Sequence, residues 1–225
     1  MQTYAQYCPI VRAVEVLGQR WTLLIVREML NGQRRFNDLA RGLPGLSRAL
    51  LSNRLRQLRA AGLVVQSADG GYDLTPAGED LRPIVFGMAE WGARHAFGDP
   101  RADELDPETL MWWFHGRVDT SEVTRRAVVQ VDVTDRRRLF WLVVEPEDAS
   151  VCYSDPGFEI DAVMRADLAT LYRMWEGEID LLDAVKAGDI ELTGPRWIVS
   201  GLPRWLMLSP IAPIVRAARA EPAAT

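Results

Sequence analysis

The chain has 225 residues, of which 48% are hydrophobic and 25% are charged, an ordinary balance for a globular protein of one large or two modest domains. Its net charge of −5 argues weakly against a nucleic-acid partner, yet residues 20–62 carry nine arginines and only two acidic residues. No uncharged apolar run approaches the roughly 18 to 20 residues of a membrane span and no secretory signal is visible, so we expect a cytoplasmic protein without a membrane partner.

The first predicted elements are short helices. Residues 9–17 read PIVRAVEVL, which is typical of a short amphipathic helix that Gly18 interrupts. Residues 21–30 read WTLLIVREML and are apolar around much of the helix, which predicts a central position in the first domain. A third helix is expected from Phe36 to about Gly42.

A fourth helix is predicted over residues 47–60, and we call it the reading helix. Leu51, Leu55 and Leu58 recur at helical spacing and form one apolar stripe. Ser47 has the right side chain for the N-cap, and Gly62 is placed to end the helix. The opposite face is polar, as expected for the second helix of a DNA-binding helix-turn-helix; its residues are Ser47, Arg48, Ser52, Asn53 and Arg56.

A two-stranded hairpin is predicted directly after the reading helix. Residues 63–66 and 72–75 read as strands, and the Asp-Gly-Gly sequence at 69–71 supplies the positive φ angles of a tight turn. A hairpin in this place is the wing of a winged helix. Thr75 and Pro76 then favour the start of a helix that we expect to reach about Phe97.

Residues 99–108 are polar and contain proline, which predicts a linker between a DNA-binding and dimerisation domain at 1–98 and a second domain at 109–225. In the second domain we expect a helix at 107–114, strands at 127–133, 139–145, 150–154, 158–164 and 190–192, and two helices before the last strand. The fold class is therefore α+β, with a mainly antiparallel sheet covered by helices. Residues 99–225 carry 14 cationic and 23 acidic residues, which disfavours DNA contact by this part.

Several blocks in the first hundred residues occur in the order found in a known family. They are Cys8-Pro9, Gly18, Arg20-Trp21-Thr22-Leu23-Leu24-Ile25, Arg34-Arg35-Phe36-Asn37-Asp38-Leu39, and Gly45-Leu46-Ser47 with Leu63-Val64. Over roughly residues 5–98 the chain resembles the HxlR-type winged-helix transcriptional regulators, which are relatives of the MarR regulators. The resemblance implies a homodimer that is built from the first and last helices of this domain and binds a palindromic operator in double-stranded DNA.

The second domain more loosely resembles the sterol-carrier-protein-like fold between Gln130 and Arg204. The resemblance is carried by Asp155-Pro156-Gly157-Phe158 and by Ala187-Gly188-Asp189-Ile190-Glu191-Leu192-Thr193-Gly194. That fold is an antiparallel sheet whose helices cover a cavity for apolar ligands. The resemblance therefore implies a sensor module with an apolar small-molecule effector.

The candidate DNA-binding residues combine the polar face of the reading helix with nearby cations and the wing. Alternatives stay open: the arginines can form a solvated helix face, Ser47 can be a cap alone, and Arg54 can be a structural pair or a phosphate contact. The wing tip is acidic and lacks arginine, which argues against strong contact by the wing. The candidates are Arg34, Arg35, Ser47, Arg48, Ser52, Asn53, Arg54, Arg56 and Gly70.

Aromatic residues of the second domain either line a ligand cavity or fill its core; the candidates are Trp113, Trp141, Tyr172, Trp175 and Trp197. Cys8 is a candidate redox switch, because some HxlR relatives sense oxidants through a cysteine near the N-terminus, whereas a lone cysteine is more often a small buried hydrophobe. The only other cysteine is Cys152, so no disulfide framework is expected. His95 and His115 match no metal spacing, and we expect neither a metal nor a cofactor.

The leading hypothesis is a homodimeric bacterial transcriptional repressor whose second domain binds an apolar effector. The alternative is a protein that binds a lipid or another apolar ligand and uses its winged helix for dimerisation or protein contact. An enzyme is disfavoured, because no nucleophile elbow, P-loop, dinucleotide fingerprint or metal cluster is present.

Overall fold

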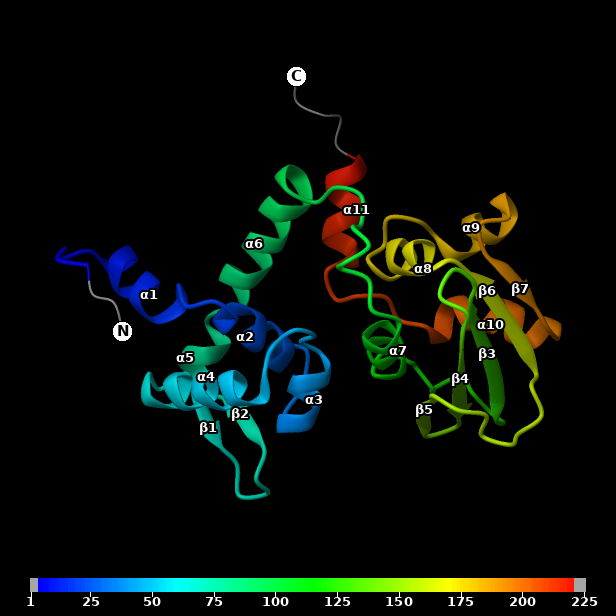
Figure 1. Ribbon diagram of the computed structural model, residues 1–225, viewed down its shortest axis with the longest axis horizontal. Helices are drawn as coiled ribbons and strands as arrows, with labels where there is room; N and C mark the ends of the chain where they lie inside the picture. Colours follow the sequence, from blue (N-terminus) through cyan, green and yellow to red (C-terminus); the bar gives the residue numbers. More distant parts are fainter. Residues whose placement is uncertain (1–3, 221–225) are drawn as a thin grey trace. The chain divides into compact units, whose positions relative to one another are not determined.

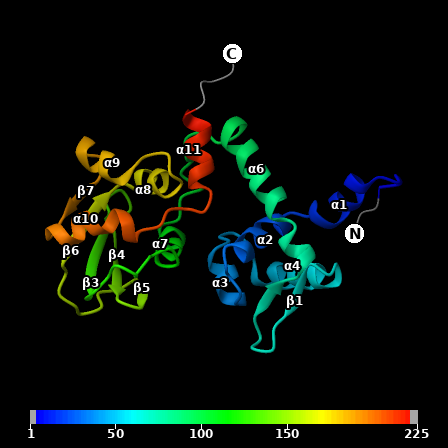
Figure 2. The same ribbon diagram turned by 180° about the vertical axis from the view of Figure 1, so that it is seen from behind.

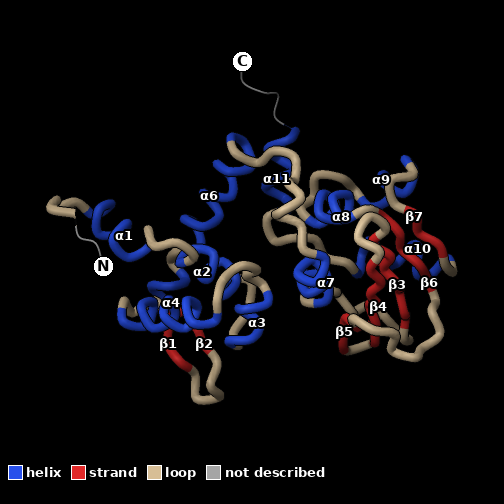
Figure 3. The backbone as a smooth tube through the Cα atoms, in the orientation of Figure 1, coloured by secondary structure: helices blue, strands red, loops and turns tan. Residues whose placement is uncertain are grey.

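The computed structural model describes residues 4–220, and the chain divides into two compact units, Met1–Ala89 and Glu90–Thr225 (Figure 1). Figure 2 shows the same elements from behind, and Figure 3 is coloured by secondary structure and shows that the first unit is largely helical and the second contains the larger sheet. Within the described range, no helix is both long enough and apolar enough to cross a membrane.

The first unit is a helix-turn-helix followed by a two-stranded antiparallel hairpin. Its core is made by α2, α3 and α4, where the side chains of Ile25, Leu39 and Leu51 are completely buried. The elements are α1 (Pro9–Leu17), α2 (Thr22–Leu30), α3 (Phe36–Arg41), α4 (Arg48–Ala60), β1 (Val64–Gln66), β2 (Tyr72–Leu74) and α5 (Pro76–Glu79), followed by α6 (Arg82–His95), which continues past residue 89. The order of helices and strands predicted for a winged helix is therefore present.

The ends of α4 have the local chemistry that the sequence predicts. Ser47 has extended backbone angles, and its hydroxyl accepts a hydrogen bond from the backbone N–H of Leu50 over 3.3 Å. The helix ends at Ala60, and Gly62 follows with a φ of +73°, a conformation that a side chain would strain. The start of the reading helix is thus fixed by one hydroxyl.

Replacing Ser47 with alanine should lower the free energy of unfolding of the first unit by about 1 kcal/mol, because the N–H of Leu50 loses its partner. Chemical denaturation followed by circular dichroism measures this change. Ser52→Ala is the matched control, because Ser52 is exposed inside the same helix and makes no cap. Equal stability of the two variants would contradict a capping role.

The predicted helix from Thr75 to about Phe97 is two helices, so the expectation of one continuous helix is wrong. The break falls between Glu79 and Arg82. Pro83 explains it, because proline has no N–H and its ring collides with the carbonyl four residues earlier in a continuous helix. Proline is tolerated near the start of a new helix, which is its position in α6.

The second unit is a five-stranded sheet with helices. Its strand order is β5-β4-β3-β6-β7. The elements in chain order are α7 (Pro107–His115), β3 (Ala127–Val133), β4 (Arg138–Glu145), β5 (Asp148–Cys152), β6 (Ala162–Ala166), α8 (Leu168–Trp175), α9 (Leu181–Ala187), β7 (Glu191–Thr193), α10 (Arg196–Trp205) and α11 (Ala212–Ala220). The expected α+β class and helix-covered sheet are present.

Strand β6 differs from the prediction in the residues that it spans and in the direction of its pairing. The strand expected at 158–164 begins at Ala162, and it pairs in parallel with β3, with Val129 opposite Ala162. The preceding residue, Asp161, binds Val128 twice: its N–H donates to the Val128 carbonyl over 3.0 Å, and its Oδ2 accepts from the Val128 N–H over 2.8 Å. The chain between β5 and β6 is therefore a crossover and not a hairpin turn, so the sheet is mixed.

The two faces of the sheet have different roles. The face that carries Phe140 and Leu142 packs against α7, α8, α9 and α10 and forms the main core of the unit. Trp141 and Val143 point to the opposite face, where they form a small cluster with Val128 and the half-buried Cys152. The alternation along β4 follows from the two-residue period of a strand.

Candidate nucleic-acid interface and ligand pocket

The outward face of α4 carries the predicted polar residues. The stripe of Leu51, Leu55 and Leu58 is buried, with at most 2% of any of these side chains exposed. Opposite this stripe, Ser47, Arg48, Ser52 and Arg56 are exposed and Asn53 is half-buried. The leucines thus anchor the helix, and its donors and acceptors are left at the surface.

Arg48 and Arg56 differ in how they are held. Arg48 donates through Nη2 to Oδ1 of Asn37 over 2.7 Å, and its guanidinium lies 5.0 Å from the centre of the Phe36 ring. Among residues 4–220, the Arg56 side chain has neither a hydrogen bond nor an ion pair. Arg48 is therefore pre-positioned by α3, whereas Arg56 extends into solvent. Asn37 was not predicted as a site residue, because only the packing of α3 against α4 brings it to Arg48.

Arg54 makes contacts within the protein. Its Nε donates to the backbone carbonyl of Arg20 over 3.0 Å, and its Nη1 donates to Oε1 of Gln57 over 2.6 Å. The first bond ties α4 to the segment before α2, and the second lies within α4. Of the two roles that the sequence left open for Arg54, the structural pair is the one with observed contacts.

Arg34 and Arg35 hold the wing. Arg34 forms an ion pair with Asp73 over 2.5 Å and donates to Ser67 over 3.3 Å. Arg35 donates to the backbone carbonyl of Asp69 over 2.6 Å and to its carboxylate over 3.0 Å. The wing tip, including the exposed Gly70, is therefore connected to the start of α3.

The hydrogen bonds and charges around Asp69 and Asp73 favour the ionised form of these two wing carboxylates. The hydrogen bond from Arg34, supported by one from Ser67, lowers the pKa of Asp73 below its ordinary value. The backbone N–H of Gly71 lowers the pKa of Asp69, and Arg35 adds to this effect. Because both folded-state pKa values are lowered, this contribution to stability is present at neutral pH and is lost as the pH falls through them. The acidic wing tip is thus explained by the arginines that it binds.

Glu28 of α2 carries a buried carboxylate that the sequence analysis did not identify. The Glu28 side chain on α2 is 3% exposed and pairs with Arg27 over 2.6 Å. Burial raises its pKa, although the Arg27 charge opposes the shift. A side chain at Gly42 would come within 2.5 Å of Oε2 of Glu28, so the glycine makes room for it. The available signal was an acidic residue next to an arginine within a largely apolar helix.

The five aromatic candidates of the second unit are not brought together. Trp113 stacks on Trp175 at 6.1 Å between ring centres and meets Tyr172 edge-on at 6.2 Å. Trp141 lies on the opposite face of the sheet, and Trp197 packs against Trp205 at 5.7 Å. Only Trp113, Trp175 and Tyr172 form one group. The rest of the main core combines aliphatic side chains with Phe114, Phe140 and Trp205.

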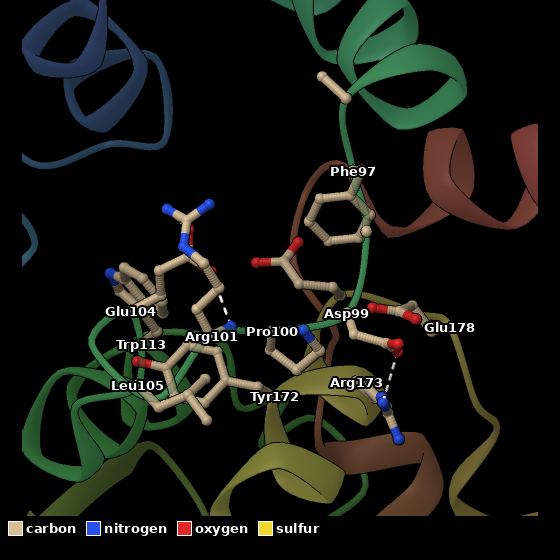
Figure 4. A pocket seen from close by; sticks show the side chains of 13 residues that line it. Phe97, Asp99, Pro100, Arg101, Glu104, Leu105, Trp113, Tyr172, Arg173 and Glu178 are labelled. Carbon is tan, nitrogen blue, oxygen red and sulfur yellow. Dashed lines mark hydrogen bonds and ion pairs between the residues drawn. The ribbon is translucent and has the colours of Figure 1, made fainter.

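A pocket of about 430 Å³ lies beside this group, within the second unit (Figure 4). It is bounded by the segment that follows α6, by Trp113 of α7, and by α8 with the loop after it. Its volume is in the range of small-molecule sites. The lining residues are Ala96, Phe97, Gly98, Asp99, Pro100, Arg101, Glu104, Leu105, Trp113, Tyr172, Arg173, Glu176 and Glu178.

The remaining candidates show no further chemistry. Cys8 is half-buried at the N-cap of α1 and makes no side-chain cap bond, so its redox role stays a prediction. His115 places Nδ1 2.8 Å from the carbonyl of Trp112 in its own helix turn. Over residues 4–220, no group of three or more His, Cys, Asp or Glu side chains is arranged to hold a metal ion.

Comparison with known proteins identifies a family for the first hundred residues. The sequence model of the HxlR-like helix-turn-helix family matches residues 16–99. The uncharacterized HTH-type transcriptional regulator YvaP of Bacillus subtilis is 36% identical over 39% of this chain and 87% of its own length. Rv3095 of Mycobacterium tuberculosis, also an uncharacterized HTH-type transcriptional regulator, is 48% identical over 36% of this chain, which spans about half (54%) of that relative. Both relatives are transcriptional regulators by name.

Solved structures are similar over a comparable share of the chain. Quinone-bound YodB from B. subtilis shares 30% identity, with 38% of this chain and 97% of that chain covered and a TM-score of 0.36. The redox regulator HypR in its reduced form shares 33% identity, with 38% and 90% covered and a TM-score of 0.34.

Proposed function

Because this chain belongs to the HxlR-like helix-turn-helix family of transcriptional regulators, we propose that it represses transcription as a homodimer on a palindromic operator. Each protomer inserts α4 into the major groove of one half-site. The observation that carries this proposal is the outward face of α4, where the predicted polar residues remain accessible while the leucines behind them are buried. The local charge supports it, since residues 20–62 carry nine arginines and two acidic residues.

The proposed contacts differ in kind. Ser52, Asn53 and Arg56 are in position to meet base edges or phosphates, and Arg48 approaches the duplex from the side of α3. Ser47 contributes chiefly as the cap and Arg54 as a helix anchor. Arg34 and Arg35 act by fixing the wing, so that Gly70 at its tip can approach the backbone of the duplex.

The proposed dimer uses α1 and α6, as the family resemblance implies. On α1, Ile10 and Val14 are 73% and 43% exposed at a spacing of four residues. On α6, Ile84, Met88 and Trp91 are 47%, 56% and 63% exposed at spacings of four and three. Two apolar stripes on helices at a protein surface favour burial against a second copy.

The second unit is proposed to be a sterol-carrier-like effector domain, with residues 99–108 as the linker and residues 1–98 as the DNA-binding domain. The support is a sheet covered by helices on one face and the pocket beside Trp113. A ligand regulates DNA binding only if it binds one arrangement of the protomers better than the other.

The test is fluorescence anisotropy of the full chain with a labelled duplex from the promoter of its own gene, repeated over a series of salt concentrations. The proposal predicts specific binding whose logarithm falls linearly with the logarithm of salt, by about 0.9 for each neutralised phosphate. A tight complex with an apolar ligand and no salt-dependent DNA binding would instead support the alternative, a carrier protein with a dimerising winged helix.

A further inference from the structure

Arg48 is the first residue of α4, directly after the Ser47 cap. Its side chain is exposed, so the N-terminal end of the reading helix presents a guanidinium group to the solvent. In helix-turn-helix complexes the N-terminal residues of the reading helix are the ones that contact base edges. The position of Arg48 on α4 therefore suits a base contact as well as a phosphate contact.

Two neighbouring side chains of α3 hold the Arg48 guanidinium. Its Nη2 donates to Oδ1 of Asn37 over 2.7 Å, and its central carbon lies 5.0 Å from the centre of the Phe36 ring. The hydrogen bond fixes the position of one end of the group, and the ring limits the tilt of its plane. Because the side chain is restricted before it binds, it loses less conformational entropy in a complex than a freely extended arginine would.

The bond to Asn37 leaves most of the donors of this guanidinium available. A guanidinium has several N–H donors in a fixed planar fork, and among residues 4–220 the Arg48 side chain uses one of them, in the bond to Asn37. Guanine presents its O6 and N7 acceptors side by side in the major groove, which matches a pair of parallel N–H groups. Adenine would instead place an amino group against one of the donors, so a fixed arginine prefers guanine.

The neighbouring arginines of α4 are held differently. Arg54 is half-buried and donates through Nε and Nη1 to the Arg20 carbonyl and to Gln57. The exposed Arg56 side chain has no hydrogen bond or ion pair with the described residues. A freely extended cation suits a phosphate, which accepts hydrogen bonds from many directions and carries no sequence information. Arg48 thus differs from both in being held while its remaining donors stay exposed.

We propose that Arg48 contacts one guanine in each half-site and that Asn37 is the positioning residue for this contact. The inference rests on the proposed function and names the base that α4 recognises. The charge of Arg48 attracts the phosphates of any duplex, whereas Asn37 controls only the direction of the N–H groups. Loss of Asn37 should therefore lower sequence specificity and leave the salt dependence of binding unchanged.

The experiment uses fluorescence anisotropy of the full chain with the duplex from the promoter of its own gene. Each guanine of the footprinted half-site is replaced in turn by 7-deazaguanine, together with its symmetric partner in the other half-site. This base pairs with cytosine normally but lacks the N7 acceptor. We expect one such pair of substitutions to weaken binding by the parent protein at least about tenfold, and to have no effect on binding by Arg48→Ala.

Asn37→Ala tests the positioning role. We expect the loss caused by 7-deazaguanine at that position to fall below about threefold, while the salt slope stays that of the parent protein because the Arg48 charge remains. The melting temperature should also stay close to that of the parent, since Asn37 is exposed on a helix and alanine favours helices. The matched control is Asn31→Ala, which changes an exposed asparagine at the end of α2 and should behave as the parent protein does.

Asn37→Asp separates positioning from direct contact. Aspartate keeps an oxygen acceptor for Nη2 of Arg48, so we expect the dependence on guanine N7 to be retained. Its negative charge should weaken binding to the native and the substituted duplex by a similar factor. Loss of the guanine dependence in both folded Asn37 variants would indicate a direct contact by the asparagine amide and would overturn the positioning role.

The inference would also be overturned by a guanine dependence that survives Arg48→Ala, or by one that is unchanged in Asn37→Ala. A parent protein that binds its operator specifically but is insensitive to every 7-deazaguanine would overturn it as well, and would leave the regulator proposal standing. A parent protein without specific duplex binding would reject the regulator proposal itself, and this inference with it.

Discussion

Replacing Arg48 and Arg56 together with alanine is expected to reduce operator affinity about 100-fold, the largest effect that we predict for the first unit. Both side chains are exposed on the face of α4 that lies opposite the buried leucines. Loss of two phosphate-neutralising charges should also make the salt dependence shallower by about 1.8 in slope. Fluorescence anisotropy against the operator duplex at several salt concentrations measures both quantities.

The control for this experiment is Arg196→Ala together with Arg216→Ala, which removes the same charge from exposed positions of α10 and α11 in the acidic unit. It should leave operator affinity and salt slope near those of the parent protein. Equal losses in the two double variants would mean that net charge alone drives binding. Unchanged affinity in the Arg48 and Arg56 variant, with the helix content retained, would reject α4 as the reading helix.

Replacing Met88 and Trp91 together with glutamate is expected to dissociate the dimer, raising its dissociation constant at least about 100-fold. A tryptophan buries about 150 Å² or more at an interface, which contributes about 4 kcal/mol at about 25 cal/mol per Å². The two residues belong to the exposed stripe of α6, so the fold of the monomer does not depend on burying them. Sedimentation velocity over a range of concentrations measures the dissociation constant.

Glu90→Ala is the control for this dimer experiment, since Glu90 is an exposed residue of the same helix outside the stripe. It should sediment as the parent protein does. The disrupted dimer should also lose most of its operator affinity, because a palindromic site needs both protomers. A monomeric parent protein, or a double variant that remains dimeric, would contradict the proposed interface.

The winged helix could be predicted from sequence because its signals are local. The leucine stripe at 51, 55 and 58, the Ser47 cap and the Asp-Gly-Gly turn each lie within a few residues of the structure that they specify. The contact between Arg34 and Asp73 spans 39 positions and depends on how the wing folds back toward α3. The role of Arg34 in holding the wing therefore appeared only in the structure.

The second unit was harder to predict for the same physical reason. The short turns in the sequence predicted hairpins between consecutive strands. The segment between β5 and β6 instead crosses over, so that β6 pairs in parallel with β3. No local sequence pattern indicates this crossover. Trp141 and Trp113 both read as candidate ligand contacts, although strand alternation places Trp141 on the face away from the main core. The pocket itself is assembled from segments more than 70 positions apart.

The central claim is that two copies of α4 enter the major groove one helical turn apart. Hydroxyl-radical footprinting combined with guanine N7 methylation interference on the operator tests it directly. We expect two related half-sites, with interfering guanines in major-groove segments whose centres lie about 10 base pairs apart. A single protected half-site, or protection without any interference at guanine N7, would contradict it.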